Sequence, residues 1–173
     1  MACLLTACSH LVLPLLSSPI HAHYNVTTRN HRLHTAVSLP QDEFKYLSCH
    51  LKDSADEVIR PKFEEAFAFI QEAQEAGKAA YIHCSVGMSR SATIAIAYIM
   101  KSTNVPLDQA FAAVKEHRAV SAPNIGFMTQ LVEFEVELFG RSTIDLEKYK
   151  ANRFEDLSEF RIAYSSLTHC NDD

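Results

Sequence analysis

A cysteine and an arginine stand six positions apart in the sequence, at Cys84 and Arg90, with Gly87 between them. An ionised cysteine is a strong nucleophile, and the planar guanidinium group of arginine binds two oxygens of a phosphate at once. Glycine lets the backbone come close to a bound anion and adopt dihedral angles that other residues avoid. Together the three residues predict a loop that binds a phosphate group and attacks its phosphorus atom with sulfur.

The segments on either side would place this loop at the start of a helix. Residues 79–82 read as a short buried strand, and residues 92–100 are apolar almost all round, as in a buried helix. Unpaired backbone amides and the positive end of the helix dipole favour a bound phosphate and a thiolate at such a position. The residues predicted to bind the phosphate are Ser85, Val86, Gly87, Met88, Ser89 and Arg90.

Two polar neighbours of this loop also have predicted roles. Ser91 would place a hydroxyl beside the sulfur and help Cys84 to leave phosphorus in a second step. His83 is better interpreted as a buried hydrogen-bonding support than as a base. The alternative is a chance spacing around an inert buried cysteine. The flanking strand, the glycine, the serines and the following helix together favour the functional interpretation.

Cleavage of a phosphate ester also requires an acid. A positioned carboxylic acid protonates the departing oxygen, and as a carboxylate it then activates water. The nearby upstream candidates are Asp53 and Asp56. For Asp56 the preferred interpretation is a charge or cap at the start of the following helix.

The run from Ile82 to Met100, IHCSVGMSRSATIAIAYIM, closely resembles the HCxxGxSRS signature of the dual-specificity protein tyrosine phosphatases. The resemblance covers about residues 41–139. It implies a phosphatase-like α/β fold and a cysteine-based reaction that uses no metal or other cofactor.

Two further stretches agree with this resemblance. Residues 51–56 look like the mobile acid loop of the family, which implies that Asp53 is the general acid. Residues 114–118 and 123–131 look like the segment that packs beneath the phosphate loop. In that segment the resemblance implies that Asn124 forms hydrogen bonds and braces the loop.

The periodicity of the middle of the chain predicts alternating strands and helices. Residues 46–51 read as the strand that leads into the acid loop, and apolar residues from Ile59 to Ala73 recur at helical spacing before Gly77. Two more helices are predicted, one opening at Pro106 and one ending at Gly140. This pattern predicts an α/β fold with a central, mainly parallel sheet flanked by helices. Lys115, His117 and Arg118 read as a solvated basic helix end, with contact to acidic phosphoproteins as the alternative.

Three parts are predicted along the chain: an atypical N-terminal segment (1–40), a catalytic domain (41–140) and a charged amphipathic tail (141–173). The leading strands of the family are not recognisable in residues 1–40. Residues 35–39 read as one strand, and the apolar run 11–16, which contains Pro14, reads as an edge element at most. The tail predicts a helix that packs on this domain or on a partner through apolar residues at helical intervals, namely Leu146, Tyr149, Phe154, Leu157, Phe160 and Tyr164.

The composition limits the cellular compartments and the classes of partner that suit this protein. The net charge of −5 argues against nucleic acid as a partner, and no apolar run is long enough to span a membrane. Five irregularly placed cysteines favour a reducing compartment, the cytoplasm or the nucleus. The N-terminus resembles a signal peptide but has no basic residue before Arg29, which argues against secretion. The densest histidine group, at residues 21–34, lacks carboxylates and zinc-ligand spacing, so no metal is expected.

The functional expectation is a protein phosphatase that hydrolyses phosphotyrosine and phosphoserine or phosphothreonine through a cysteinyl-phosphate intermediate. Its expected partners are phosphorylated proteins, and the sequence does not indicate an oligomeric state. Two alternatives remain. A phosphoinositide phosphatase would be favoured by lysines in the loop, which has none. A phosphoprotein-binding pseudophosphatase is disfavoured because Cys84, Arg90 and Asp53 are all present.

Overall fold

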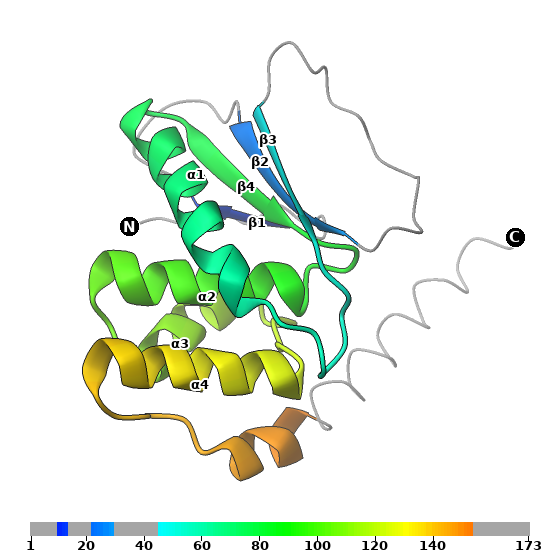
Figure 1. The fold of residues 1–173 in the computed structure, drawn as a ribbon, viewed down its shortest axis with the longest axis vertical. Helices are drawn as coiled ribbons and strands as arrows, with labels where there is room; N and C mark the ends of the chain where they lie inside the picture. The colour runs from blue at the N-terminus through cyan, green and yellow to red at the C-terminus, as the bar shows by residue number, and fades with distance from the viewer. Residues whose placement is uncertain (1–9, 14–21, 30–44, 154–173) are drawn as a thin grey trace, which may run out of the picture.

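The computed structural model describes residues 10–13, 22–29 and 45–153 of the chain. Its elements in chain order are β1 (His10–Leu13), β2 (Ala22–Arg29), β3 (Lys45–His50), the 3-10 helix η1 (Arg60–Lys62), α1 (Phe63–Glu75), β4 (Ala79–His83), α2 (Arg90–Thr103), α3 (Leu107–His117) and α4 (Ile125–Phe139). Residues 146–153 form a further helical segment. Figure 1 shows α1 in front of the sheet, with α2, α3 and α4 packed together at its lower end.

Within the described residues the sheet has the strand order β1-β4-β2-β3. Strand β2 pairs in parallel with both β3 and β4, whereas β1 pairs antiparallel with β4. The predicted α/β fold with a mainly parallel sheet is therefore confirmed. The parallel strands β3 and β4 lead at their carboxyl ends into the acid loop and the phosphate loop. Both loops therefore lie at the same end of the sheet.

Strand β2 is the main correction to the sequence analysis, which found no strand at residues 22–29. Val26 and Thr28 of this strand are fully buried. The Thr28 hydroxyl donates a hydrogen bond of 3.1 Å to the carbonyl oxygen of His83. Because Thr28 is polar, it weakens the alternation of apolar residues by which a strand is recognised in a sequence. Strand β2 is therefore recognised through its pairing with β3 and β4. Strand β1 lies at the sheet edge, as expected for the run at 11–16, and residues 35–39 lie outside the described residues.

The predicted helices are all present in the described part of the chain. The helix expected from Ile59 to Ala73 starts as the turn η1 and continues as α1, followed by Gly77 at φ +65°. Helix α2 is buried over most of its length, as its composition predicted. Helix α3 follows Pro106, and α4 is followed by Gly140 at φ +72°. Glycine suits these left-handed positions after helix ends because it has no Cβ.

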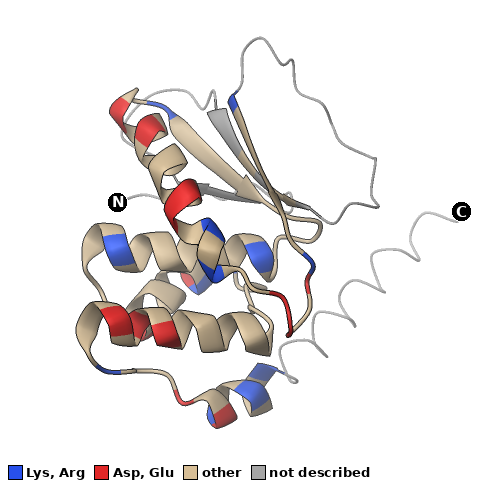
Figure 2. Cartoon of the chain, in the orientation of Figure 1, with Lys and Arg blue, Asp and Glu red and all other residues tan. Residues whose placement is uncertain are grey.

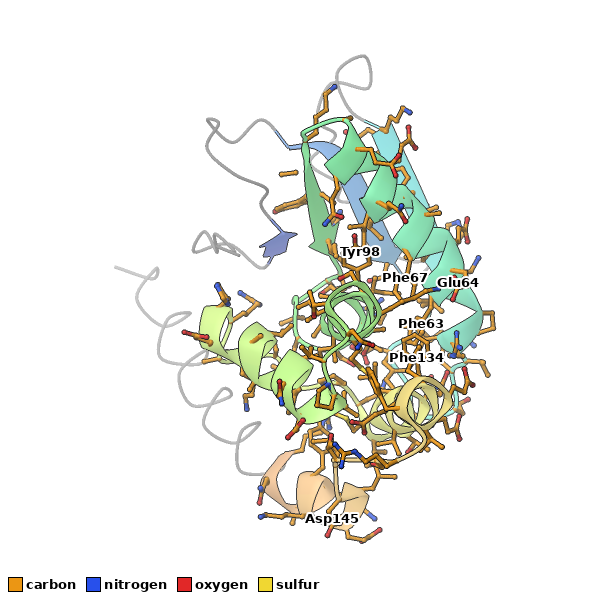
Figure 3. All side chains as sticks on the ribbon, turned by 90° about the vertical axis from the view of Figure 1, so that its left-hand side faces the viewer. Phe63, Glu64, Phe67, Tyr98, Phe134 and Asp145 are labelled. Carbon is orange, nitrogen blue, oxygen red and sulfur yellow. The ribbon has the colours of Figure 1, made fainter. Side chains whose placement is uncertain are left out.

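Aromatic side chains join three of the helices into one core. The ring of Phe63 lies 5.3 Å from that of Phe134, and the ring of Phe67 lies 5.7 Å from that of Tyr98, measured between centroids. Figure 3 shows these side chains between α1, α2 and α4. Contacts of this kind bury large apolar areas with a preferred geometry. They hold α2 in place, and therefore hold the phosphate loop that precedes it.

The described start of the tail packs on its own domain, which is one of the two outcomes the sequence left open. The ring of Tyr149 meets that of Phe111 edge to face, with centroids 5.8 Å apart. The Tyr149 hydroxyl and Arg153 Nε donate hydrogen bonds of 2.7 and 2.8 Å to the carbonyl oxygen of Pro123. The remaining residues of the predicted helix, at 154–173, lie outside the described residues.

In the view of Figure 2, acidic and basic residues are interspersed over the described helices, and no continuous basic stripe runs along them. Acidic residues predominate on α1 and α4. Among the described helices, none combines the length and the apolar character needed to cross a bilayer.

Candidate active site

Cys84 follows the last residue of β4 and is almost completely buried, with 6% of its surface exposed. Its Sγ accepts hydrogen bonds from the Gly87 amide at 3.0 Å and from the Ser91 hydroxyl at 3.3 Å. Burial acts to raise the pKa of the Cys84 thiol, but the bonds from Ser91 and Gly87 and the charge of Arg90 outweigh it and lower the pKa below its ordinary value. The sulfur is thus prepared to act as a thiolate.

The guanidinium group of Arg90 lies buried between the two loops. One terminal nitrogen donates to the carbonyl oxygen of Leu51 at 3.2 Å, and the other donates to the Ser85 hydroxyl at 3.1 Å. Its Nε lies 3.7 Å from Oδ2 of Asp53 and is a buried donor without a hydrogen bond within the described residues. The predicted cation and acid are therefore neighbours in space, although they come from different segments of the chain.

The phosphate loop is held from outside through its carbonyl groups. Arg118 donates from Nε to the Gly87 carbonyl oxygen at 2.8 Å and from a terminal nitrogen to the Val86 carbonyl oxygen at 2.9 Å. The Ala122 amide donates to the carbonyl oxygen of Met88 at 2.9 Å. Carbonyls that point outward leave the amides of a tight loop free to point inward, where an anion binds.

Arg118 is the residue that the sequence analysis misjudged most. Its side chain is half-buried and binds the phosphate loop, so the prediction of a solvated helix end is wrong for this residue. A basic residue at the end of a helix looks the same in sequence whether it faces water or a loop. The one available signal was its place in the segment 114–118, which resembles the part of the family that packs beneath the loop.

Asp53 is the carboxylate that the structure places beside Arg90. Its Oδ1 accepts a hydrogen bond of 2.9 Å from Nδ2 of Asn124, and its side chain is 36% exposed. Asp56 has another environment: the neighbouring Ser54 side chain lowers its pKa, and it lines a groove with Pro61 and Thr129. Within the described residues, Asp53 is the candidate acid that contacts the phosphate-binding arginine.

Asn124 connects the two loops. Its backbone amide donates to the Ser89 hydroxyl at 3.0 Å, which braces the phosphate loop. Its side chain donates to Asp53, as described above, and to the Ser54 carbonyl oxygen at 3.2 Å. The side-chain oxygen accepts from the Phe127 amide at 2.9 Å and so caps α4. The resemblance implied a brace for the phosphate loop; the side chain of Asn124 also holds the acid loop.

The remaining predicted residues lie at the end of β4, in the phosphate loop and at the start of α2. His83 is buried with 7% exposure, its ring lies 5.5 Å from that of Tyr81, and its carbonyl accepts the bond from Thr28. Ser89 and Ser91 are buried, whereas Val86 is 46% exposed on the outside of the loop. The structure thus brings together every residue predicted for this site.

No group of three histidine, cysteine, aspartate or glutamate side chains able to hold a metal is found among the described residues. The histidine group at residues 21–34 lies outside the described side chains.

Comparison with known proteins identifies related sequences. Dual specificity protein phosphatase 1-A of Xenopus laevis is 40% identical over 102 residues, which are 59% of this chain and 28% of that protein. Dual specificity protein phosphatase 1 of Arabidopsis thaliana is 42% identical over 115 residues, 65% of this chain and 57% of that protein. The chain spans only 28% or less of the length of several of the curated relatives it matches.

Solved structures with the same fold are also found. The human tyrosine phosphatase-like serine/threonine/tyrosine-interacting protein gives a TM-score of 0.64 at 32% identity, covering 67% of this chain and 78% of that one. Human DUSP28 gives a TM-score of 0.62 at 30% identity, covering 68% of this chain and 76% of that one.

A family model described as dual specificity phosphatase, catalytic domain, matches residues 5–137. This match begins upstream of β1 and ends within α4, so it includes the N-terminal strands that the sequence analysis did not recognise. Together with the loop of Cys84 and Arg90, it shows that the chain belongs to the dual specificity phosphatase family.

Proposed function

We propose that this protein is a cysteine-dependent phosphatase that hydrolyses phosphotyrosine and phosphoserine or phosphothreonine in proteins. The observation that carries the proposal is the meeting of three groups around one loop. The Cys84 sulfur accepts two hydrogen bonds that favour its thiolate, and Arg90 lies between that loop and Asp53. Nucleophile, phosphate-binding cation and acid are the parts that such a reaction requires.

In the first step, Arg90 and the loop amides would hold the phosphate oxygens while the Cys84 thiolate attacks phosphorus. The bond from phosphorus to the ester oxygen breaks, and protonated Asp53 gives its proton to that oxygen. The products are the free hydroxyl of the substrate, a cysteinyl phosphate and the Asp53 carboxylate.

In the second step, the Asp53 carboxylate would take a proton from water, and the water oxygen attacks phosphorus. The bond between sulfur and phosphorus breaks and inorganic phosphate leaves. The hydrogen bond of 3.3 Å from the Ser91 hydroxyl to Sγ would stabilise Cys84 as it departs as a thiolate. Because this chemistry depends on a reduced thiol, the cytoplasm or the nucleus is the compartment we propose.

The two alternatives predict different substrates. Acidic inositol lipids call for cationic side chains around the phosphate, and the loop positions Ser85, Val86 and Met88 are neutral. A pseudophosphatase would bind a phosphoprotein without turning it over. Cys84, Arg90 and Asp53 are all present, and Arg90 lies beside Asp53, which supports the enzyme.

The test is a comparison of the wild-type chain with Cys84→Ser on phosphotyrosine, phosphoserine and phosphothreonine peptides and on short-chain phosphoinositides. Phosphate release from the peptides is expected for the wild type and none above background for Cys84→Ser, which should still bind vanadate. Serine fits the loop, but its hydroxyl stays protonated where a thiol ionises. Release from phosphoinositides alone would favour the lipid phosphatase. Peptide binding without release would favour the pseudophosphatase.

A further inference from the structure

The acid loop that begins at residues 51–56 continues to the start of η1 at Arg60, and its residues 53–60 lie along the beginning of α4. We propose that Gly126 and Gln130 of α4 are positioning residues that fix this loop where Asp53 can protonate the leaving group. This inference rests on the proposed function, because it assigns two residues to the reaction of the same site. Within the described part of the chain, the contacts of Gly126 and Gln130 are with the acid loop and not with Cys84 or Arg90.

Gly126 is a point of contact between two backbones. A Cβ atom at this position would lie 1.9 Å from the carbonyl oxygen of Ala55 and 2.8 Å from its Cα. Side-chain carbons essentially never come closer than 3.0 Å to such atoms. Backbone cannot rotate away as a flexible side chain would, so a methyl group here must push the acid loop off α4. Gly126 lies within a helix, where alanine is otherwise the better residue.

Gln130 holds the far end of the same loop through all of its polar groups. Its Oε1 accepts hydrogen bonds from the amides of Ile59 and Arg60 at 2.9 and 3.0 Å. Its Nε2 donates to the carbonyl oxygens of Glu57 and Gly126 at 2.9 and 3.2 Å. An amide side chain has two acceptor sites and two donor hydrogens, and this arrangement uses each of them.

These contacts form a continuous line with Asn124. Along the start of α4, Asn124 binds Asp53 and Ser54, Gly126 meets Ala55, and Gln130 binds residues 57–60. The acid is therefore located mainly by α4, with one ion-pair contact to Arg90. Proton transfer requires hydrogen-bond distance, so a shift of about 1 Å in the loop is enough to slow it.

An open groove flanks the contact between the acid loop and α4. A groove of about 590 Å³ runs between the loop and α4, lined by Ala55, Val58, Gly126 and Gln130 among others. Val58 is 61% exposed beside it. The groove interrupts the packing of the loop on α4, so the contacts of Asn124, Gly126 and Gln130 carry the positioning of the loop.

The experiment compares Gly126→Ala and Gln130→Met with the wild type on two substrates, a phosphotyrosine peptide and an aryl phosphate with an acidic phenol. Only the peptide depends strongly on protonation of its leaving group. Each variant should lower kcat on the peptide by roughly 10- to 100-fold, with a loss below about 3-fold on the aryl phosphate. KM and vanadate affinity should not change. Thr129→Ala is the matched control, because Thr129 lines the groove but, among the described residues, forms its side-chain hydrogen bond within α4, to the Ile125 carbonyl oxygen.

Equal losses on both substrates, or an unchanged kcat on the peptide, would overturn the proposal. Gln130→Met supplies the test if Gly126→Ala does not fold. Amide hydrogen exchange of residues 53–60 gives a readout independent of activity, and faster exchange is expected in both variants but not in Thr129→Ala. If the wild type hydrolyses neither substrate, the proposed function fails, while unchanged exchange in the variants would refute the positioning role by itself.

Discussion

The phosphate loop and the acid loop lie side by side in the site, but they are held in different ways. The phosphate loop is bound by Arg118, Ala122 and Asn124, the strand end before it is bound by Thr28, and its cysteine is 6% exposed. The acid loop is fixed along α4, and its Asp53 is 36% exposed. Segments with few buried contacts open at lower free-energy cost than the core. The phosphate loop is thus held more firmly than the acid loop, which is held mainly by its contacts with α4.

The largest expected effect comes from breaking the rigid loop. Arg90→Lys should lower kcat/KM by about 10³-fold or more, because lysine cannot present a planar fork to two oxygens. It would also leave the carbonyl of Leu51 and the hydroxyl of Ser85 without their donors. The loss should be similar for a phosphotyrosine peptide and an activated aryl phosphate, measured by steady-state kinetics. A loss confined to the peptide would show that Arg90 acts through the acid loop instead.

A smaller and more selective effect is expected from the acid loop. Asp53→Ala should lower kcat on phosphopeptides by roughly 10²- to 10⁴-fold with little change in KM, since the carboxylic acid acts in the transition state. The activated aryl phosphate should be affected much less. Asp56→Ala is the matched control in the same loop. A greater loss in Asp56→Ala than in Asp53→Ala would reverse the assignment of the acid.

The smallest effect is a shift in titration, and it compares two buried thiols. Burial raises the pKa of Cys49, in the sheet core, from 9.0 to about 11. The bonds and charge around Cys84 lower its pKa below 9.0 despite burial. The rate of iodoacetate alkylation, followed by peptide mapping against pH, should therefore rise for Cys84 at lower pH than for Cys49. Equal reactivity at neutral pH would contradict the environment assigned to Cys84.

The pKa shifts of Cys84 and Cys49 change the pH dependence of folding stability in opposite directions. Because the folded state lowers the Cys84 pKa, ionisation of this thiol favours folding above the unfolded pKa, and that contribution is lost as pH falls through the folded value. Because the folded state raises the Cys49 pKa, its contribution is complete below 9.0 and is lost as pH rises towards about 11. The Cys49 contribution is measured by comparing the thermal unfolding of Cys49→Ala with that of the wild type between pH 9.0 and about pH 11.

The local part of the site could be predicted from sequence, and the long-range part could not. The loop from Cys84 to Arg90 is specified by one strand, one glycine and one helix that are adjacent in the chain. Gly126 and Gln130 act on residues about 70 positions away, and nothing in their own neighbourhood records this. Strand β2 was missed for the same reason, since a buried threonine at a strand position is recognised only through its distant partner.

The place of β2 in the sheet has a consequence for synthesis of the chain on the ribosome. β2 lies between β3 and β4, and it pairs in parallel with both. β4 is synthesised about 50 residues after β2, which takes several seconds at roughly 5–20 residues per second. Until then one edge of β2 has no partner strand, and unpaired edges are sites of aggregation and of chaperone binding. The phosphate loop follows β4 directly, so the nascent chain acquires its site only after this exposed interval has ended.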